Sequence, residues 1–115
     1  MNIKHCLFDY DNVLCGGETL VVCEGPFDAI RVNWFGERWG IRATCLFGKS
    51  ISPEQEALLF GLSSLYRDKI AFFDFDAFEK LLLPDYLGIK LKYLPAGIND
   101  PAEFDEHSFN KVLGF

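Results

Sequence analysis

The residues best suited to chemistry are two acids one residue apart, Asp74 and Asp76, which end the apolar stretch Ile70 to Phe73. A short apolar run with polar ends is typical of a buried strand, and strand residues two apart point to the same side. Two carboxylates held together there repel each other and lose hydration, so a positive charge should offset them. A hard divalent cation such as Mg²⁺ fits this need, because it prefers oxygen ligands. The alternative is a strand that leaves the core through an ordinary acidic turn.

A third acid, Glu24, ends another buried strand, which the apolar run Leu20-Val21-Val22-Cys23 predicts. Pro26 then begins a helix well, because proline lacks the N–H that a first helical turn leaves unpaired. Asp28 falls in that first turn, where a negative charge suits the helix dipole. Gly40 is expected to end this helix as its C-cap.

Strands and helices alternate along the rest of the chain. We expect strands over 41–47, 70–73 and 89–94, and helices from the capping signal Ser52-Pro53-Glu54-Gln55, over about 77–83 and over about 101–113. Such alternation predicts an α/β fold with a mainly parallel four-stranded sheet and helices on both faces. Ligands of such sheets bind beyond the carboxyl ends of the strands. Glu24, Asp74 and Asp76 should meet at that rim and form a metal site.

Composition narrows the class of protein. The chain has 115 residues, half of them hydrophobic, which suits one domain with a real core. No apolar run approaches the roughly 20 residues that span a bilayer, so we expect no membrane segment. The four cysteines form no C-x-x-C pair, which disfavours zinc and fits a reducing, cytoplasmic location. A net charge of −6 disfavours a free-standing nucleic-acid binder.

Four segments in order resemble the TOPRIM domain of bacterial and phage-type DNA primases. The strand that ends in Glu24-Gly25 is similar to the first TOPRIM motif, and Asp74-Phe75-Asp76 is similar to its D-x-D motif. The segment from Ala43 to Gln55 resembles the strand–glycine–helix piece between them, and Leu94 to Phe104 resembles a primase segment ending in Asp-Pro-x-Glu-Phe. The resemblance covers residues 20–104, so we expect a lead-in segment over 1–19 and a TOPRIM-like domain over 20–115.

The resemblance implies nucleotidyl transfer in primer synthesis, helped by Mg²⁺ or Mn²⁺. It assigns Glu24, Asp74 and Asp76 to catalysis and metal binding, with Asp28 as a further metal ligand. Asp100 is a less certain addition, and Lys49 could meet a phosphate. The implied partners are nucleoside triphosphates, a single-stranded DNA template and a helicase. Because the chain is acidic, we expect a basic partner domain or chain to hold the template.

Several alternatives remain at this stage. The chain could be a nucleotide- and metal-binding TOPRIM module without catalysis, or a TOPRIM nuclease. Phe8-Asp9-Tyr10-Asp11 also looks like the first motif of haloacid-dehalogenase-type phosphatases, in which a strand ends in D-x-D. Trp34 and Trp39 could stack on bases. Their helical spacing with Phe27 and Ile30 is more typical of a core or an interface.

Overall fold

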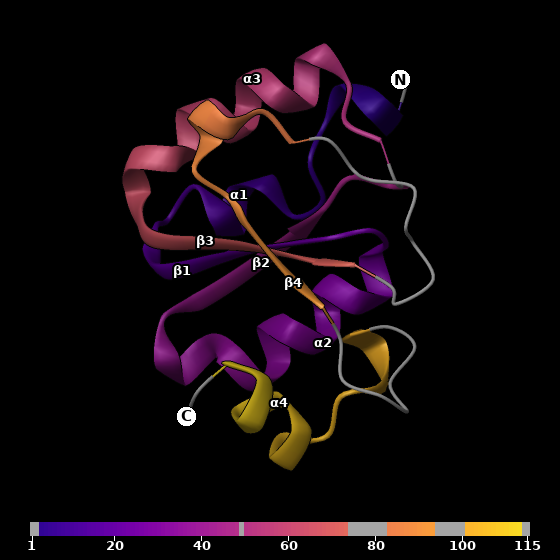
Figure 1. Ribbon diagram of the computed structural model, residues 1–115, viewed down its shortest axis with the longest axis vertical. Helices are drawn as coiled ribbons and strands as arrows, with labels where there is room; N and C mark the ends of the chain where they lie inside the picture. Colours follow the sequence, from indigo (N-terminus) through magenta and orange to yellow (C-terminus); the bar gives the residue numbers. More distant parts are fainter. Residues whose placement is uncertain (1–2, 49, 74–82, 94–100, 114–115) are drawn as a thin grey trace.

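Figure 1 shows the computed structural model, which describes residues 3–48, 50–73, 83–93 and 101–113. Its strands are β1 (Gly17–Cys23), β2 (Ile41–Cys45), β3 (Tyr66–Phe73) and β4 (Lys90–Tyr93). Its α-helices are α1 (Tyr10–Val13), α2 (Pro26–Gly36), α3 (Pro53–Leu62) and α4 (Glu106–Leu113). Short 3-10 turns are η1 (Ile3–His5), η2 (Glu37–Trp39), η3 (Ser63–Leu65), η4 (Asp85–Leu87) and η5 (Pro101–Glu103).

The four strands form one parallel sheet in the order β2-β1-β3-β4. β1 is central, with Val21 level with Ala43 of β2 on one side and with Ile70 of β3 on the other. β4 lies at one edge beside β3, with Lys90 level with Ile70. The predicted α/β fold with a parallel four-stranded sheet is confirmed.

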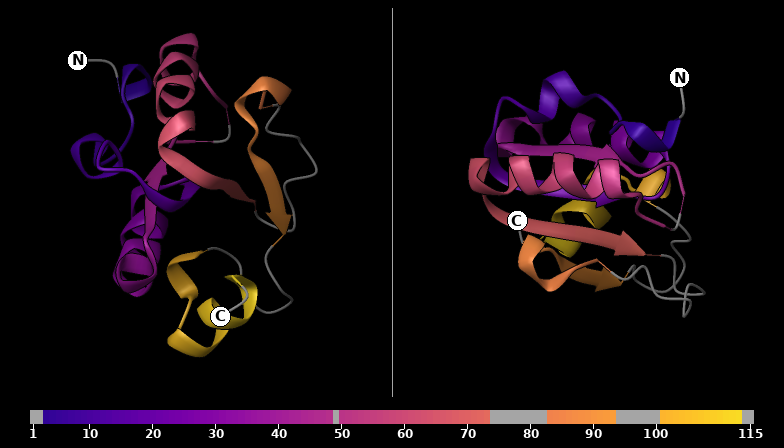
Figure 2. Two further views of the ribbon diagram at one scale, coloured as in Figure 1. Left: turned by 90° about the vertical axis from the view of Figure 1, so that its left-hand side faces the viewer. Right: turned by 90° about the horizontal axis from the view of Figure 1, so that it is seen from above.

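Helices cover both faces of the sheet, as Figures 1 and 2 show. On one face, α1, α3 and η4 pack over a core that includes Leu20, Val22 and Leu59. On the other, α2, η5 and α4 pack over a core that includes Val21 and Phe72. The alternation of β1 residues between the two cores is the period of two that a strand dictates.

The helix-start signals in the sequence act as expected. Pro26 and Pro53 each take the first helical position. Gly40 was expected to end the helix that begins at Pro26, but α2 ends at Gly36, and Gly40 instead caps η2 with a left-handed φ of 72°. The Ser52 hydroxyl accepts the backbone N–H of Gln55 at 3.1 Å. Gln55 is fully buried, and its Nε2 donates to the carbonyls of Cys6 and Leu46 at 3.1 and 2.8 Å. One capping residue therefore ties α3 to two distant segments.

Two strands begin earlier than the sequence suggests. β1 starts at Gly17 rather than Leu20, and β3 starts at Tyr66 rather than Ile70. Their first residues pair with each other, Gly17 with Tyr66 and Thr19 with Asp68. The hydrogen bonds between strands involve only the backbone, so polar residues can take part in them. The apolar pattern of the sequence therefore does not mark where these two strands begin.

The aromatic face of α2, expected in a core or an interface, is largely exposed and does not belong to the core. Phe27 and Trp34 are 76% and 78% exposed, whereas Ala29 and Val32 are buried. Small residues face the sheet, because a Cβ at Gly36 would lie only 2.6 Å from the Cβ of Ile41. Close packing of helix on strand thus selects the small face of α2, so the core prediction for this aromatic face was wrong.

The last expected helix is divided into η5 and α4, which a short turn at residues 104–105 separates. Phe104 and Phe109 are buried as expected and stack edge to face, with ring centroids 6.0 Å apart. The helix expected over 77–83 lies almost wholly outside the described residues. In the described part of the chain, no helix is long and apolar enough to cross a membrane.

The lead-in segment is packed into the fold. Leu7 and Val13 are buried in the α3-side core, and the Tyr66 hydroxyl donates to the Val13 carbonyl at 2.5 Å. Arg42 of β2 donates to the Gly16 carbonyl at 2.8 Å. The expected division between residues 1–19 and 20–115 falls inside β1, so the lead-in supplies the start of the central strand.

We predict that Leu7→Ala lowers the free energy of unfolding by about 2–4 kcal/mol, because it leaves a cavity in a closed core. Leu14→Ala is the matched control, since Leu14 is 46% exposed, and it should change stability by less than about 0.5 kcal/mol. Urea denaturation measures both. Equal, small effects would mean that the lead-in does not contribute to the core.

Candidate metal centre

The carboxyl ends of all four strands lie along one edge of the sheet, because the strands are parallel. Glu24 directly follows β1, and Asp74 directly follows β3 in the sequence. β1 and β3 are neighbours, with Val22 level with Ala71 one residue before the end of β1. The pairing therefore directs the chain at Glu24 and the chain entering Asp74 toward the same rim.

Glu24 occupies a partly enclosed position at this rim. Its side chain is half-buried, and its Oε1 atom is buried. Its backbone carbonyl accepts the N–H of Gly48 at 2.9 Å, and the Cys23 carbonyl accepts the N–H of Leu46 at 3.0 Å. The loop after β2 is thus held against the loop after β1, which fixes the backbone that carries Glu24.

The loop after β2 is strained at the same place. Phe47 has a φ of 58°, a left-handed conformation that a bulky residue rarely adopts, and Gly48 follows with a φ of 143°. The Phe47 ring meets Phe8 edge to face, with centroids 6.3 Å apart. Such strain persists only where the surroundings enforce it and is common at functional sites. Sequence reasoning identified Gly48 as the end of the strand but missed the strain at Phe47.

Asp28 joins two of the segments that resemble primase motifs. It is 9% exposed, and its Oδ2 accepts the Gly25 N–H at 3.3 Å at the start of α2. Its Oδ1 accepts the Ala102 N–H of η5 at 3.2 Å. The Asp-Pro-x-Glu-Phe segment therefore docks beside the Glu24-Gly25 turn. The sequence placed Asp28 in the first helical turn, but only the fold shows this contact with η5.

The remaining expected site residues, Lys49, Asp74, Asp76 and Asp100, lie outside the described residues. Among residues 3–48, 50–73, 83–93 and 101–113, no three side chains of metal-binding type gather at one point. The three-acid cluster therefore stays a prediction.

Two buried thiols near the rim have raised pKa values, partly because of negative charge nearby. Burial, and then the charges of Asp28 and Glu24 among others, raise the pKa of Cys23 well above its ordinary value. Burial also raises the pKa of Cys45 to about 11, although a hydrogen bond from the Phe47 backbone opposes the rise. Both thiols stay protonated at neutral pH. Neither is suited to bind a soft metal, which requires thiolate.

The donors at the rim fit a hard divalent cation. Glu24 offers carboxylate oxygen, the ligand that Mg²⁺ and Mn²⁺ favour. Asp28 already accepts two backbone N–H groups, so it is better placed to hold the Glu24 turn or a metal-bound water. Glu24 would hold the metal directly, together with Asp74 and Asp76.

The phosphatase-like motif does not have the structure that its chemistry requires. Asp9 is the N-cap of α1 with a φ of 53°, and Asp11 lies in the first turn of that helix. No strand precedes Asp9 within residues 3–8. A nucleophilic Asp at the end of a strand is therefore not found here.

No model of a known protein family matches the sequence, and no curated protein does. Solved structures do match. The structure of the DnaG catalytic core has a TM-score of 0.68 and 20% identity, over 99% of this chain and 40% of that one. The primase fragment of the bacteriophage T7 primase-helicase protein has a TM-score of 0.61 and 19% identity, over 96% of this chain and 48% of that one. The DnaG primase catalytic domain bound to ssDNA has a TM-score of 0.58 and 16% identity, over 97% of this chain and 41% of that one.

At these identities the likeness shows the fold alone: the chain shares its α/β fold with parts of these primase structures. The chain spans between 40% and 48% of the length of these matched structures.

We predict that Cys45 lowers the free energy of unfolding by about 2 kcal/mol between pH 9 and 11, because its pKa is raised in the folded chain. The unfolded chain releases this thiol proton near pH 9, whereas folded Cys45 keeps its proton to about 11. Stability is therefore full below pH 9 and is lost as the pH rises. Cys45→Ala should flatten this slope, and exposed Cys15→Ala should not. Urea denaturation at several pH values measures it; parallel slopes in both variants would contradict the assignment.

Proposed function

We propose that this chain is a primase-type TOPRIM domain that binds Mg²⁺ or Mn²⁺ and takes part in nucleotidyl transfer during primer synthesis. The observation that carries the proposal is the convergence of primase-like segments at one place. The Glu24 turn, the strained Phe47 loop and η5 are joined there by the backbone carbonyl of Glu24 and the side-chain carboxylate of Asp28, which both accept backbone N–H groups. The match to primase catalytic structures supports it.

In this proposal the chain's own residues bind and orient. Glu24, Asp74 and Asp76 would hold the cation, and Asp28 would fix the Glu24 turn. Lys49 and Asp100 would flank the site. A divalent cation lowers the pKa of an attacking hydroxyl and stabilises negative charge on a leaving pyrophosphate. Glu24, half-buried at the rim, could also accept the proton of that hydroxyl.

The chain corresponds to less than half of the matched primase structures, so we propose that it acts with a basic partner domain or chain. Nucleoside triphosphates would be its substrates, with single-stranded DNA as template and a helicase as a further partner. Four free thiols support a cytoplasmic location. A phage source remains part of the proposal, because one matched structure comes from a bacteriophage protein.

The second candidate is a non-catalytic module that binds metal and nucleotide. The observation in its favour is that the chain spans only 40% to 48% of the length of the matched primase structures. Such a module would keep metal affinity without turnover.

We predict that millimolar Mn²⁺ raises the melting temperature, because a cation relieves the repulsion between carboxylates. At ten times Kd the gain is about 1.4 kcal/mol. Glu24→Gln, Asp74→Asn and Asp76→Asn should each abolish the rise. Asp85→Asn removes an equal charge from an exposed position in η4 and should keep it. A melting temperature that Mn²⁺ does not change, or an equal loss in Asp85→Asn, would count against the site.

We predict that the chain alone makes no primer and that a basic primase core lacking its own TOPRIM segment restores synthesis. The assay uses single-stranded template, nucleoside triphosphates and Mn²⁺, with Asp76→Asn as the inactive variant and Asp85→Asn as its control. Restored activity that Asp76→Asn abolishes supports the catalytic proposal. No synthesis in any combination, with Mn²⁺ binding intact, supports the module instead.

A further inference from the structure

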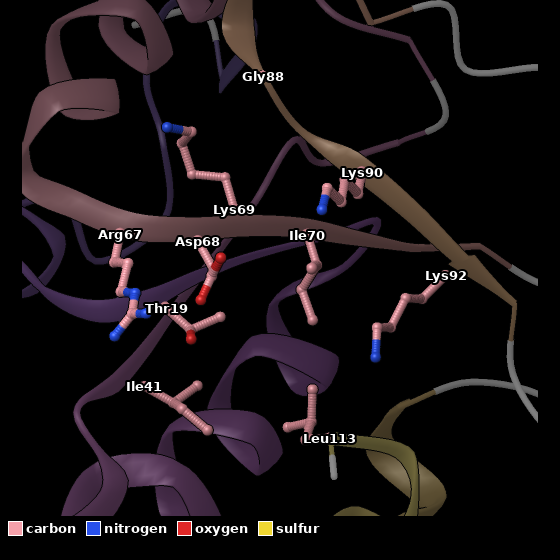
Figure 3. Close-up of a pocket in the computed structure, with 10 residues that line it drawn as sticks. All are labelled: Thr19, Ile41, Arg67, Asp68, Lys69, Ile70, Gly88, Lys90, Lys92 and Leu113. Atoms are coloured by element: carbon pink, nitrogen blue, oxygen red, sulfur yellow. The ribbon is translucent and has the colours of Figure 1, made fainter.

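A cavity of about 400 Å³ lies on the α2 and α4 side of the sheet, below β3 and the edge strand β4 (Figure 3). Four of the chain's 11 basic residues line it, and Asp68 is the one acid among the lining residues. The basic residues are Arg67, Lys69, Lys90 and Lys92. In a chain of net charge −6, this is an unusual concentration of positive charge.

The two lysines of β4 lie on the inner face of the sheet. Lys90 is level with Ile70 and Lys92 with Phe72, and both of these neighbours are buried. Between the two lysines, Leu91 points to the opposite face of the sheet and is 47% exposed. Lys90 is exposed and Lys92 is half-buried, so both ammonium groups are accessible to a ligand.

The cavity has a cationic side and an apolar side. Figure 3 shows Lys90 and Lys92 reaching from β4 into the space that Ile41 and Leu113 border from below. Lys69 extends to the opposite side of β3 and donates to the Ser63 carbonyl at 3.0 Å, so we leave it out of the site.

The positive charges of the cavity are not neutralised by ion pairs in the described part of the chain. The ion pairs found there are His5–Glu54 and Arg38–Glu106, and neither lies at the cavity. Lys92 donates one hydrogen bond to the Val112 carbonyl at 3.2 Å, which leaves two of its three donors for a ligand.

We infer that this cavity binds successive phosphate groups of a single-stranded nucleic acid, through Lys90, Lys92 and Arg67. Lysines two residues apart on one strand lie about 6.6 Å apart, a spacing that lets an extended backbone meet both. The apolar border suits sugars and bases. The choice of a nucleic acid over other polyanions rests on the proposed function. The site would supply part of the basic surface that the sequence alone does not reveal.

The test measures binding of a short labelled oligothymidylate by fluorescence anisotropy, at about 50 mM salt and with EDTA present. The paired substitution Lys90→Gln with Lys92→Gln should weaken binding roughly tenfold or more and reduce the salt slope by about 1.4. Lys90→Arg with Lys92→Arg keeps the charge and should bind like the native chain. Asp68→Asn removes the acid of the lining and should strengthen binding.

The matched control is Lys111→Gln, which removes one positive charge from an exposed position on α4 outside the cavity lining and should have little effect; its single-charge counterpart in the cavity is Lys92→Gln alone. Melting temperatures confirm that each variant is folded. If Lys111→Gln and the β4 variants lose affinity equally, the loss reflects only the net charge of the chain, and the inference is overturned. If the native chain does not bind the oligothymidylate, the inference is also overturned, and the lysines would serve to protect an edge strand against aggregation.

Two competitors separate nucleic acid from other anions. Unlabelled oligothymidylate should displace the probe, whereas inorganic pyrophosphate and polyglutamate at equal charge should displace it poorly. Equal displacement by either would overturn the nucleic-acid assignment. Because EDTA removes divalent cations, this result does not depend on the metal site. A failure to bind oligothymidylate would not affect the Mn²⁺ result, and a failure to bind Mn²⁺ would not affect the oligothymidylate result.

Discussion

The parallel pairing of β1 with both of its neighbours determines at which edge of the sheet β1, β2 and β3 end. Parallel strands place all their carboxyl ends at one edge, and their crossovers place helices on the two faces. Glu24 therefore emerges beside the end of β3, and the loop after β2 can hydrogen-bond to the Glu24 backbone. An antiparallel β3 would carry Asp74 to the opposite edge and divide the predicted acid cluster.

A second layer of contacts holds the rim together. Asp28 connects the start of α2 with η5, and Gln55 connects α3 with the loop after β2 and the lead-in. Both side chains are buried and have polar partners, so removing either would leave buried backbone groups unsatisfied. The segments around the candidate site are thus held by polar groups whose partners are far away in the sequence.

Charge is divided between two regions of the sheet. Glu24 and Asp28 lie toward the carboxyl rim, where burial and then their charges, among others, raise the pKa of Cys23. Basic side chains gather below β3 and β4, around the cavity bordered by Ile41 and Leu113. An acidic chain can therefore offer a local cationic surface. The net charge of −6 alone did not predict this, because a sum over the chain contains no positions.

Local signals in the sequence determined much of this protein. Proline and capping residues set the starts of α2 and α3, and apolar runs set the centres of the strands, because these effects act within a few residues. The order of motifs also predicted a likeness to primases, and the fold is shared with primase structures. Tertiary structure alone decided which face of α2 is buried, since the close approach of Gly36 to Ile41 selects small residues over aromatic ones. It also decided that Asp28 binds η5 and that Lys90 and Lys92 line a cavity. These features depend on segments that meet only after folding, so no local pattern encodes them.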